Sequence, residues 1–240
     1  MRNDLDVSDD LSAVSARGLG RRFSLQWAVR DVTFVLPPRS VLLVVGPNAS
    51  GKTTLLRLLA TALRPTDGGG SVFGRDLVRD ANAVRVLTAF VGTSAGAYDL
   101  LTVRENLAFA AAMRGRPDAP VATWLDRVGL TPVADDPVRG LSSGMKRRLA
   151  LAQAWLAAPR LLLLDEPYGG LDRDGLALVA EMTEDTTRRG GSVVIATHEW
   201  ERVMNAADAV LALAAGRPVE VGPAAQLTAA DLAAAAGGRR

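Results

Sequence analysis

Short runs of consecutive apolar residues recur along this chain, each bounded by polar residues or glycine. A strand buried on both faces of a parallel sheet has this pattern, because neither of its faces meets water. Five such runs predict the strands of a mostly parallel sheet, and they lie at 41–45 (VLLVV), 86–91 (VLTAFV), 161–164 (LLLL), 193–196 (VVIA) and 210–213 (VLAL).

Stretches with helical periodicity lie between these runs and predict helices. Pro159 follows one stretch, and Gly190 and Gly191 follow another, at positions where these residue types commonly end a helix. The four stretches cover 52–63, 104–114, 145–158 and 175–189. Because strands alternate with helices, the sequence predicts an α/β fold.

The region at about 93–160 differs from the rest, because it holds helices without an apolar strand between them. Its turns, such as RGRPDAP and GLTPVADDPVRG, are rich in glycine and proline. We expect this region to be a helical subdomain inserted in the α/β body. We also expect a polar lead-in at 1–13, one domain at 14–221 and an alanine-rich tail at 222–240.

The composition argues against several kinds of chemistry. The 240 residues include no cysteine and one histidine, which leaves out disulfides, thiolate metal sites and cysteine nucleophiles and argues against a zinc centre. The net charge is +2 and the arginines are scattered, so we expect no nucleic acid partner.

No stretch approaches the roughly 20 apolar residues that a membrane-spanning helix needs. The first residues, MRNDLDVSDDLSAV, hold four aspartates and no apolar segment, so they do not resemble a secretory signal. We therefore expect a chain that stays in the cytoplasm and does not cross a membrane by itself.

The apolar run at 41–45 leads directly into GPNASGKTT, residues 46–54. The pattern G-x-x-x-x-G-K-[ST] begins there at Gly46 and ends at Thr53. Glycines let backbone N–H groups curl around an anion, and the helix that follows directs its positive end to the same place. Lys52 can reach the β- and γ-phosphates of a nucleotide, and the Thr53 hydroxyl can bind Mg²⁺.

The alternative is a strand-to-helix turn that is rich in glycine for no chemical reason. Such a turn requires neither the lysine nor the hydroxyl at these positions. We therefore predict nucleotide binding by the loop, with the binding residues Gly46, Pro47, Asn48, Ala49, Ser50, Gly51, Lys52, Thr53 and Thr54.

A phosphate-binding loop also needs a carboxylate for magnesium at the end of a neighbouring strand. The run LLLLDEP supplies Asp165 and, directly after it, Glu166. We expect Asp165 to hold Mg²⁺ directly or through water, and Glu166 to polarise the water that attacks the γ-phosphate. The alternative is a solvated turn before Pro167.

His198 is the only histidine, and it follows the predicted strand VVIA. A lone histidine is usually a polar residue satisfied by its neighbours. Its place at the end of a strand of the predicted sheet is where ligand-binding residues gather, which favours a role at the nucleotide.

With these residues in place, the chain from about 14 to 221 resembles the ATP-binding subunit of an ABC transporter. The decisive stretch is LSSGM, 141–145, which matches the family pattern LSGGQ about twenty residues before LLLLDEP. Read alone, LSSG would be only a helix N-cap at Ser142. The resemblance implies a P-loop core, an antiparallel β part near the N-terminus and an inserted helical subdomain. It also implies that Ser142, Ser143 and Gly144 cap the γ-phosphate of ATP in the opposite subunit.

The resemblance carries further roles to this chain. Phe23 matches the aromatic residue that stacks on adenine, although a core residue is the alternative. The segment GGLD, which ends at Asp172, matches the loop that crosses the dimer seam. His198 matches the histidine that contacts the γ-phosphate, so Lys52, Glu166 and His198 form the expected catalytic set.

Two positions depart from the family pattern. Where the family has a glutamine that touches Mg²⁺, this chain has Thr93, whose shorter oxygen we expect to reach the metal through water. In the signature, Ser143 replaces a glycine and Met145 a glutamine, which could weaken or tune the contact with ATP.

The resemblance implies a head-to-tail dimer, most simply of two copies, around two ATP and Mg²⁺. It also implies a separate integral membrane subunit that receives the movement and holds the chain at the cytoplasmic face of the cell membrane. The sequence looks closest to the haem exporters of cytochrome c maturation, and drug or lipid exporters are the alternative.

Two other classes stay open besides exporters. An ABC ATPase of DNA repair or the ribosome would carry a second P-loop or long heptad repeats, and this chain has neither. A regulator that binds ATP without efficient turnover is favoured by Thr93 and the altered signature.

Overall fold

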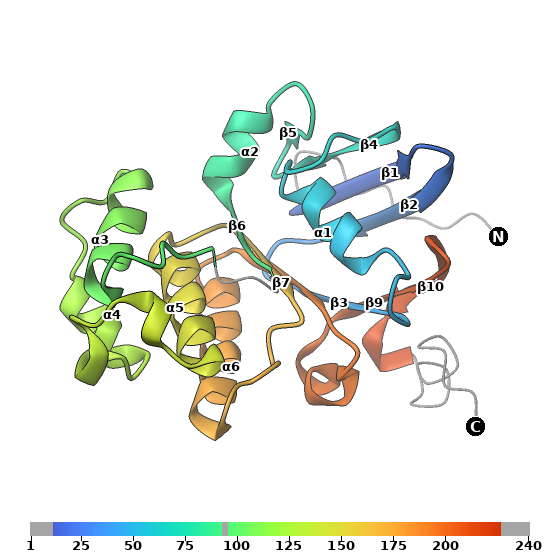
Figure 1. Ribbon diagram of the computed structural model, residues 1–240. Coiled ribbons are helices and arrows are strands. Elements are labelled where there is room, and N and C mark those ends of the chain that lie inside the picture. Colours follow the sequence, from blue (N-terminus) through green and yellow to red (C-terminus); the bar gives the residue numbers. More distant parts are fainter. Residues whose placement is uncertain (1–11, 93–95, 227–240) are drawn as a thin grey trace.

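The computed structural model describes residues 12–92 and 96–226 (Figure 1). They form a four-stranded and a six-stranded sheet. The four-stranded sheet has the order β2-β1-β4-β5 and is antiparallel throughout, which confirms the antiparallel part expected near the N-terminus. Its strands are β1 (Val14–Phe23), β2 (Gln26–Leu36), β4 (Asp67–Val72) and β5 (Arg75–Asp76).

The six-stranded sheet has the order β10-β9-β3-β8-β7-β6. All of its pairs are parallel except β9 with β10, so the predicted mostly parallel sheet is confirmed. Its strands are β3 (Val41–Val45), β6 (Thr88–Val91), β7 (Leu161–Asp165), β8 (Ser192–Ala196), β9 (Ala209–Ala214) and β10 (Arg217–Pro223).

Two predicted elements are shorter than their apolar runs. Val86 and Leu87 belong to helix α2 (Ala81–Leu87), and Val86 is 77% exposed, so the strand begins only at Thr88. Helix α1 (Lys52–Leu59) ends well before residue 63, because Thr61 has a φ of 55° and turns the chain out of the helix.

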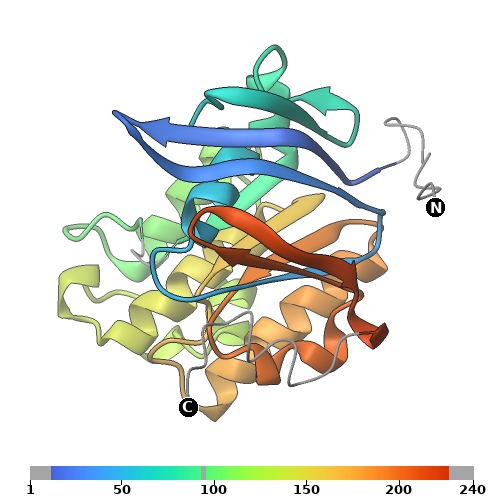
Figure 2. The same cartoon turned by 90° about the vertical axis from the view of Figure 1, so that its right-hand side faces the viewer.

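Helix α1 lies between the two sheets (Figure 1). Its buried leucines share one hydrophobic cluster with residues of both, including Val14 of β1 and Leu42 of β3. Figure 2 shows the antiparallel sheet above the six-stranded sheet and the yellow and orange helices of residues 143–188 below it. The phosphate-binding loop, which precedes α1, therefore starts from the centre of the core.

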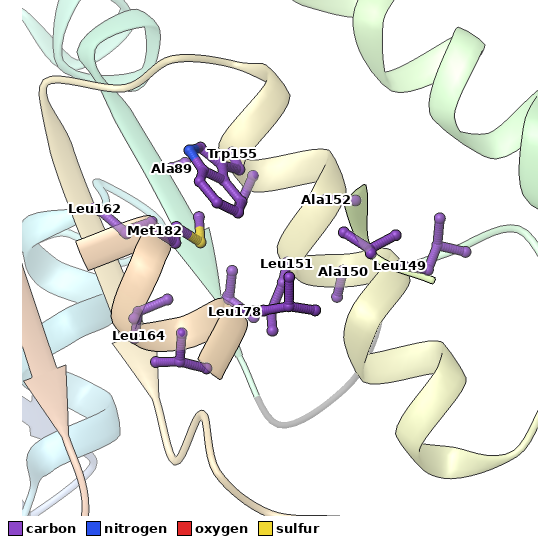
Figure 3. Packing of buried hydrophobic residues seen from close by; sticks show 14 of the residues in the cluster. Ala89, Leu149, Ala150, Leu151, Ala152, Trp155, Leu162, Leu164, Leu178 and Met182 are labelled. Atoms are coloured by element: carbon purple, nitrogen blue, oxygen red, sulfur yellow. The ribbon is translucent and has the colours of Figure 1, made fainter. Parts of the chain in front are cut away.

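The opposite face of the six-stranded sheet is covered by α5 (Ser143–Leu156) and α6 (Arg173–Arg188). Trp155 of α5 donates from Nε1 to Asp185 Oδ2 of α6 at 2.7 Å, which joins the two helices. Figure 3 shows this packing, to which α5 contributes Leu151 and Trp155, α6 contributes Leu178 and Met182, and β7 contributes Leu162 and Leu164.

Helices α3 (Val103–Met113) and α4 (Val121–Arg127) lie farther from the sheet than α5 (Figure 1). Thr102 and Glu105 form a capping box that fixes the start of α3. Between β6 and β7 the described residues form helices and turns. Within the described residues, short 3₁₀ turns lie at Thr131–Val133, Val138–Gly140, Trp200–Arg202, Met204–Ala206 and Ala224–Gln226.

The proposed domain boundaries stay predictions. Most of the lead-in at 1–13 and of the tail at 222–240 lies outside the described residues, and within the expected subdomain at 93–160 helix α5 packs on the sheet itself. In the described ranges, no helix is both long and apolar enough to cross a membrane.

We predict that Leu162→Ala lowers the free energy of unfolding by about 2 to 5 kcal/mol, because it leaves a cavity in the centre of this packing. Leu162 is fully buried, whereas Leu100 is 78% exposed and gives a matched control as Leu100→Ala. Urea denaturation of both variants measures the difference. Equal losses in the two variants would contradict this description of the core.

Candidate nucleotide-binding site

The loop between β3 and α1 requires glycine at both ends for steric reasons. Gly46 has a φ of 150°, and a Cβ there would lie 2.2 Å from the Leu213 carbonyl oxygen. Gly51 has a φ of 107°, and its Cβ would lie 2.4 Å from the Ala28 carbonyl oxygen. The two glycines of the motif therefore let the loop pass tightly between β9 and β2.

Lys52 is the first residue of α1 and is 6% exposed. Its Nζ donates to the carbonyl oxygens of Gly46 at 2.7 Å and Pro47 at 3.1 Å. Burial lowers the pKa of Lys52, and the nearby Glu166 and Asp165 charges oppose this shift. The ammonium group is thus held beside the loop, between its carbonyls and two carboxylates.

Asp165 ends β7 and is 1% exposed, so the alternative of a solvated turn is wrong. Neither carboxylate oxygen accepts a hydrogen bond within the described structure. Burial raises the pKa of Asp165, and the Glu166 charge adds to this, while the approach of the Thr53 hydroxyl and the Arg57 and Lys52 charges oppose it.

A buried carboxylate that accepts no hydrogen bond from the described residues fits a hard cation such as Mg²⁺, which prefers oxygen ligands. In the described residues, no group of three or more histidine, aspartate or glutamate side chains could hold a metal. This agrees with the way Mg²⁺ binds beside nucleotides, where one or two protein oxygens act together with phosphate and water. Asp165 and Thr53 are the protein groups that would hold it.

Glu166 is placed by contacts on both its main chain and its side chain. Its φ is 48°, and its N–H donates to the Ala196 carbonyl of β8 at 2.8 Å. Its Oε2 accepts from the Thr197 hydroxyl at 3.0 Å and the His198 N–H at 3.3 Å, and lies 2.9 Å from His198 Nδ1. The structure therefore brings Glu166 and the only histidine together at neighbouring strand ends.

Asp165 and Glu166 border a hollow of about 540 Å³, which is also lined by the loop from Asn48 to Thr54 and by Phe23, whereas His198 is not among its lining residues. Phe23 is 45% exposed, so the core alternative is wrong. The Arg21 guanidinium lies 4.7 Å from the centre of the Phe23 ring and is anchored to the Arg64 carbonyl at 3.0 Å. A ring held in this way offers a stacking surface for a base.

The signature residues do not line this hollow. Ser142 caps α5 by accepting from the Met145 N–H at 3.2 Å, as predicted. A Cβ on Gly144 would lie 2.8 Å from the Gly170 carbonyl oxygen, so the signature packs against the GGLD segment. The structure brings these two segments together, apart from the phosphate-binding loop.

Asp172, which the resemblance places at the dimer seam, makes two contacts within the chain. It caps α6 by accepting from the Gly175 N–H at 2.9 Å and pairs with Arg148 of α5. The Arg148 hydrogen bond is the main reason why the pKa of Asp172 is lowered. Thr93, the remaining predicted metal residue, lies outside the described residues.

Sequence reasoning missed two residues that hold the catalytic segment. Thr197 could have been found from its position beside His198 at a strand end. Arg147, whose guanidinium reaches the carbonyls of Asp165 and Glu166, carries no signal in the sequence, because it stands among the other basic residues of KRR.

We predict that Asp165→Asn stabilises the metal-free protein at pH 8 by about 1 kcal/mol, because it removes a buried charge without partners. The folded-state pKa is raised, so the contribution of Asp165 to stability falls as the pH rises through it. The stability gained by Asp165→Asn should therefore be smaller in acid. Because the variant lacks a carboxylate that would hold Mg²⁺, it should also bind ATP with Mg²⁺ more weakly.

Urea denaturation in EDTA and ATP titration with Mg²⁺ measure the two effects. Asp126→Asn, on the exposed side of α4, serves as the control and should change neither. A loss of stability in metal-free Asp165→Asn would contradict this account of the carboxylate.

The chain is similar to curated ATP-binding proteins over most of its length. It is 38% identical over 187 residues to the cytochrome c biogenesis ATP-binding export protein CcmA of Pseudomonas putida (strain GB-1), which covers 77% of this chain and 89% of that protein. It is 34% identical over 233 residues to the daunorubicin resistance ATP-binding protein DrrA3 of Streptomyces coeruleorubidus, which covers 95% of this chain and 72% of that protein.

The fold is similar to that of a solved structure described as the ATP binding subunit of an ABC transporter. The two superpose with a TM-score of 0.81 at 24% identity, covering 88% of this chain and 90% of the other. The sequence profile of the family described as ABC transporter matches residues 29–169, which include the phosphate-binding loop, the signature and both carboxylates. The chain belongs to the ABC transporter family, as an ATP-binding and ATP-hydrolysing subunit with the ABC ATPase fold.

Proposed function

We propose that two copies of this chain close around two ATP molecules with Mg²⁺ and drive a separate membrane subunit that exports its substrate. The main support is one observation. The signature residues Ser142, Ser143 and Gly144 do not line the hollow that the phosphate-binding loop lines. One chain therefore carries two separated halves of a site. A twofold, head-to-tail pair of copies completes both sites at once.

In each completed site, the loop from Gly46 to Thr54 and Lys52 bind the phosphates, and Phe23 stacks on the adenine. Asp165 and Thr53 would hold Mg²⁺, with Thr93 as the residue predicted to reach it through water, and the metal would supply positive charge beside the phosphates. The signature serines and Gly144 of the other copy, at the positive end of α5, meet the γ-phosphate. Asp172 lies at the seam between the copies.

Glu166 acts as the base in hydrolysis. Its carboxylate takes a proton from a water molecule as the water oxygen attacks the γ-phosphorus, and the bond from that phosphorus to the bridging oxygen breaks to release ADP. The contacts of Oε2 with Thr197 and His198 fix the direction of this carboxylate. His198 stands next to the γ-phosphate position and orients the base.

The membrane subunit docks beside α3 in this proposal. Tyr98 and Phe109 meet edge to face at 5.1 Å, and Met113 is 70% exposed. They border a hollow of about 450 Å³, which adjoins another of about 730 Å³ through Phe90 and Arg114. Exposed apolar side chains around a hollow suit an apolar helix of a partner protein.

This docking site would hold the chain at the cytoplasmic face of the membrane. For the cargo we propose haem, as part of cytochrome c biogenesis, since the relative from Pseudomonas putida is named for that process. A drug or lipid exporter is the alternative, supported by the relative named for daunorubicin resistance. The membrane protein that co-purifies with this chain decides between them.

A second candidate is a regulator that binds ATP and turns it over poorly. Ser143 and Met145, which stand where the family has glycine and glutamine, favour it. The rate of hydrolysis measured with the membrane subunit bound separates the two candidates, because a transport motor speeds up when coupled and a regulator stays slow.

We predict that Glu166→Gln keeps ATP affinity within about threefold of the parent but slows hydrolysis at least about a hundredfold, because the base is lost and the phosphate contacts stay. The variant should therefore accumulate as an ATP-bound dimer, which size-exclusion chromatography with light scattering detects.

Lys52→Ala is the control for ATP binding, since it removes a charged donor to phosphate and should lose both affinity and dimer. Hydrolysis by Glu166→Gln at the parental rate would show that another group is the base.

We predict that Met113→Glu lowers recovery of the integral membrane subunit at least about fivefold when the chain is purified from native membranes in detergent, because it places a charge in the apolar docking surface. ATP hydrolysis by the free chain should not change. Val219→Glu is the matched control, because Val219 is 51% exposed on β10, at the opposite edge of the sheet from β6. Equal recovery with both variants would place the docking site elsewhere.

A further inference from the structure

Arg147 is a buried charged residue next to the catalytic segment. It lies on α5, five positions after Ser142, and is 7% exposed. Its guanidinium donates to three main-chain carbonyls: from Nη1 to Gly92, and from Nη2 to Glu166 and, at 3.2 Å, to Asp165. Burial lowers the pKa of Arg147, and the charges of Asp165 and Glu166 oppose the shift.

These three carbonyls stand at the ends of two neighbouring strands. Gly92 follows β6, Asp165 ends β7 and Glu166 follows β7 directly. Arginine suits such a position, because its planar fork serves several acceptors at once and keeps its charge when buried. One side chain of α5 therefore ties together the strand end that leads toward Thr93 and the strand end that carries both carboxylates.

The contact with Glu166 bears on the geometry of the base. Glu166 has a φ of 48°, a backbone conformation that residues other than glycine rarely adopt. Its N–H is held by Ala196 of β8, and its carbonyl is held by Arg147. Both ends of this residue are thus fixed before its side chain reaches Thr197 and His198.

We propose that Arg147 is a positioning residue for ATP hydrolysis. Through its contacts, the position of the Glu166 main chain follows the position of helix α5. Because Ser142 begins the same helix, about 7.5 Å of helix axis separates the signature from Arg147. The end of α5 that meets nucleotide in one site is therefore linked to the base of the other site. This inference rests on the proposed function, in which Glu166 is the base and α5 meets the nucleotide of the partner copy.

Arg148, the next residue, reaches in another direction. It pairs with Asp172 at the start of α6, and its Nη1 donates to the Val128 carbonyl at 3.3 Å. The two consecutive arginines therefore connect α5 to different segments, Arg148 to the expected dimer seam and Arg147 to the carboxylates. Of these two arginines, only Arg147 donates to the main chain of Glu166 in the described hydrogen bonds.

The test compares Arg147→Met and Arg147→Lys with Arg75→Met, an exposed arginine of β5. For Arg147→Met we expect kcat to fall at least about tenfold while KM and the affinity for ATP stay within about twofold, because the phosphate contacts are made elsewhere. Arg147→Lys keeps the charge but not the fork, so its kcat should fall by about threefold or more. Arg75→Met should match the parent.

If Arg147 acts through Glu166, the rate decreases caused by Arg147→Met and by Glu166→Gln should not multiply in the double variant. In a Glu166→Gln background, we expect Arg147→Met to lower the single-turnover rate by less than about twofold further. A merely structural role would instead lower the fraction of protein that binds ATP, which titration of active sites measures. If Arg147→Met does not fold, the same comparison is made with Arg147→Lys.

The proposal would be overturned if both Arg147 variants kept the parental kcat. It would also be overturned if Arg147→Met slowed Glu166→Gln by the same factor by which it slows the parent. Both of these results leave the proposed function intact. Parental hydrolysis by Glu166→Gln alone would overturn the assignment of the base and, with it, the role of Arg147.

Discussion

Burial of strands β3, β7 and β8 on both faces is the constraint on which the rest of the structure depends. Every residue of these strands is buried, so their sides carry apolar residues and their polar chemistry appears at their carboxyl ends. Because the strands are parallel, these ends meet at one edge of the sheet. The phosphate-binding loop, Asp165 with Glu166, and Thr197 with His198 lie there for that reason.

The same edge holds several arrangements that would be unfavourable in a merely structural part of a protein. Lys52 and Asp165 are buried, and the Asp165 carboxylate accepts no hydrogen bond from the part of the chain that the structure describes. Glu166 adopts a backbone conformation unusual for its type. The packing of α1 on one face of the sheet and of α5 and α6 on the other supplies the stability that tolerates them. Their concentration at one edge is typical of a site prepared for a charged ligand.

Much of this site could be predicted from local pattern. The apolar runs located all five predicted strands, and the spacing from Gly46 to Thr53 identified the loop, because both depend on residues close in sequence. Ser142 was recognised as an N-cap in the same way. The predicted ends of elements were less accurate, since only exposure of Val86 and the turn at Thr61 decided where α2 and α1 stop.

By itself the sequence determined the family, the phosphate-binding loop and the identity of the two carboxylates, since each is written in a short run of residues. Only the tertiary structure decided that His198 meets Glu166, that Asp165 lacks partners and that Arg147 reaches the strand ends. These contacts join residues 18 or more positions apart, as in Arg147 with Asp165. Such contacts depend on how helices pack on the sheet, and that packing is a property of the whole core and not of any one segment.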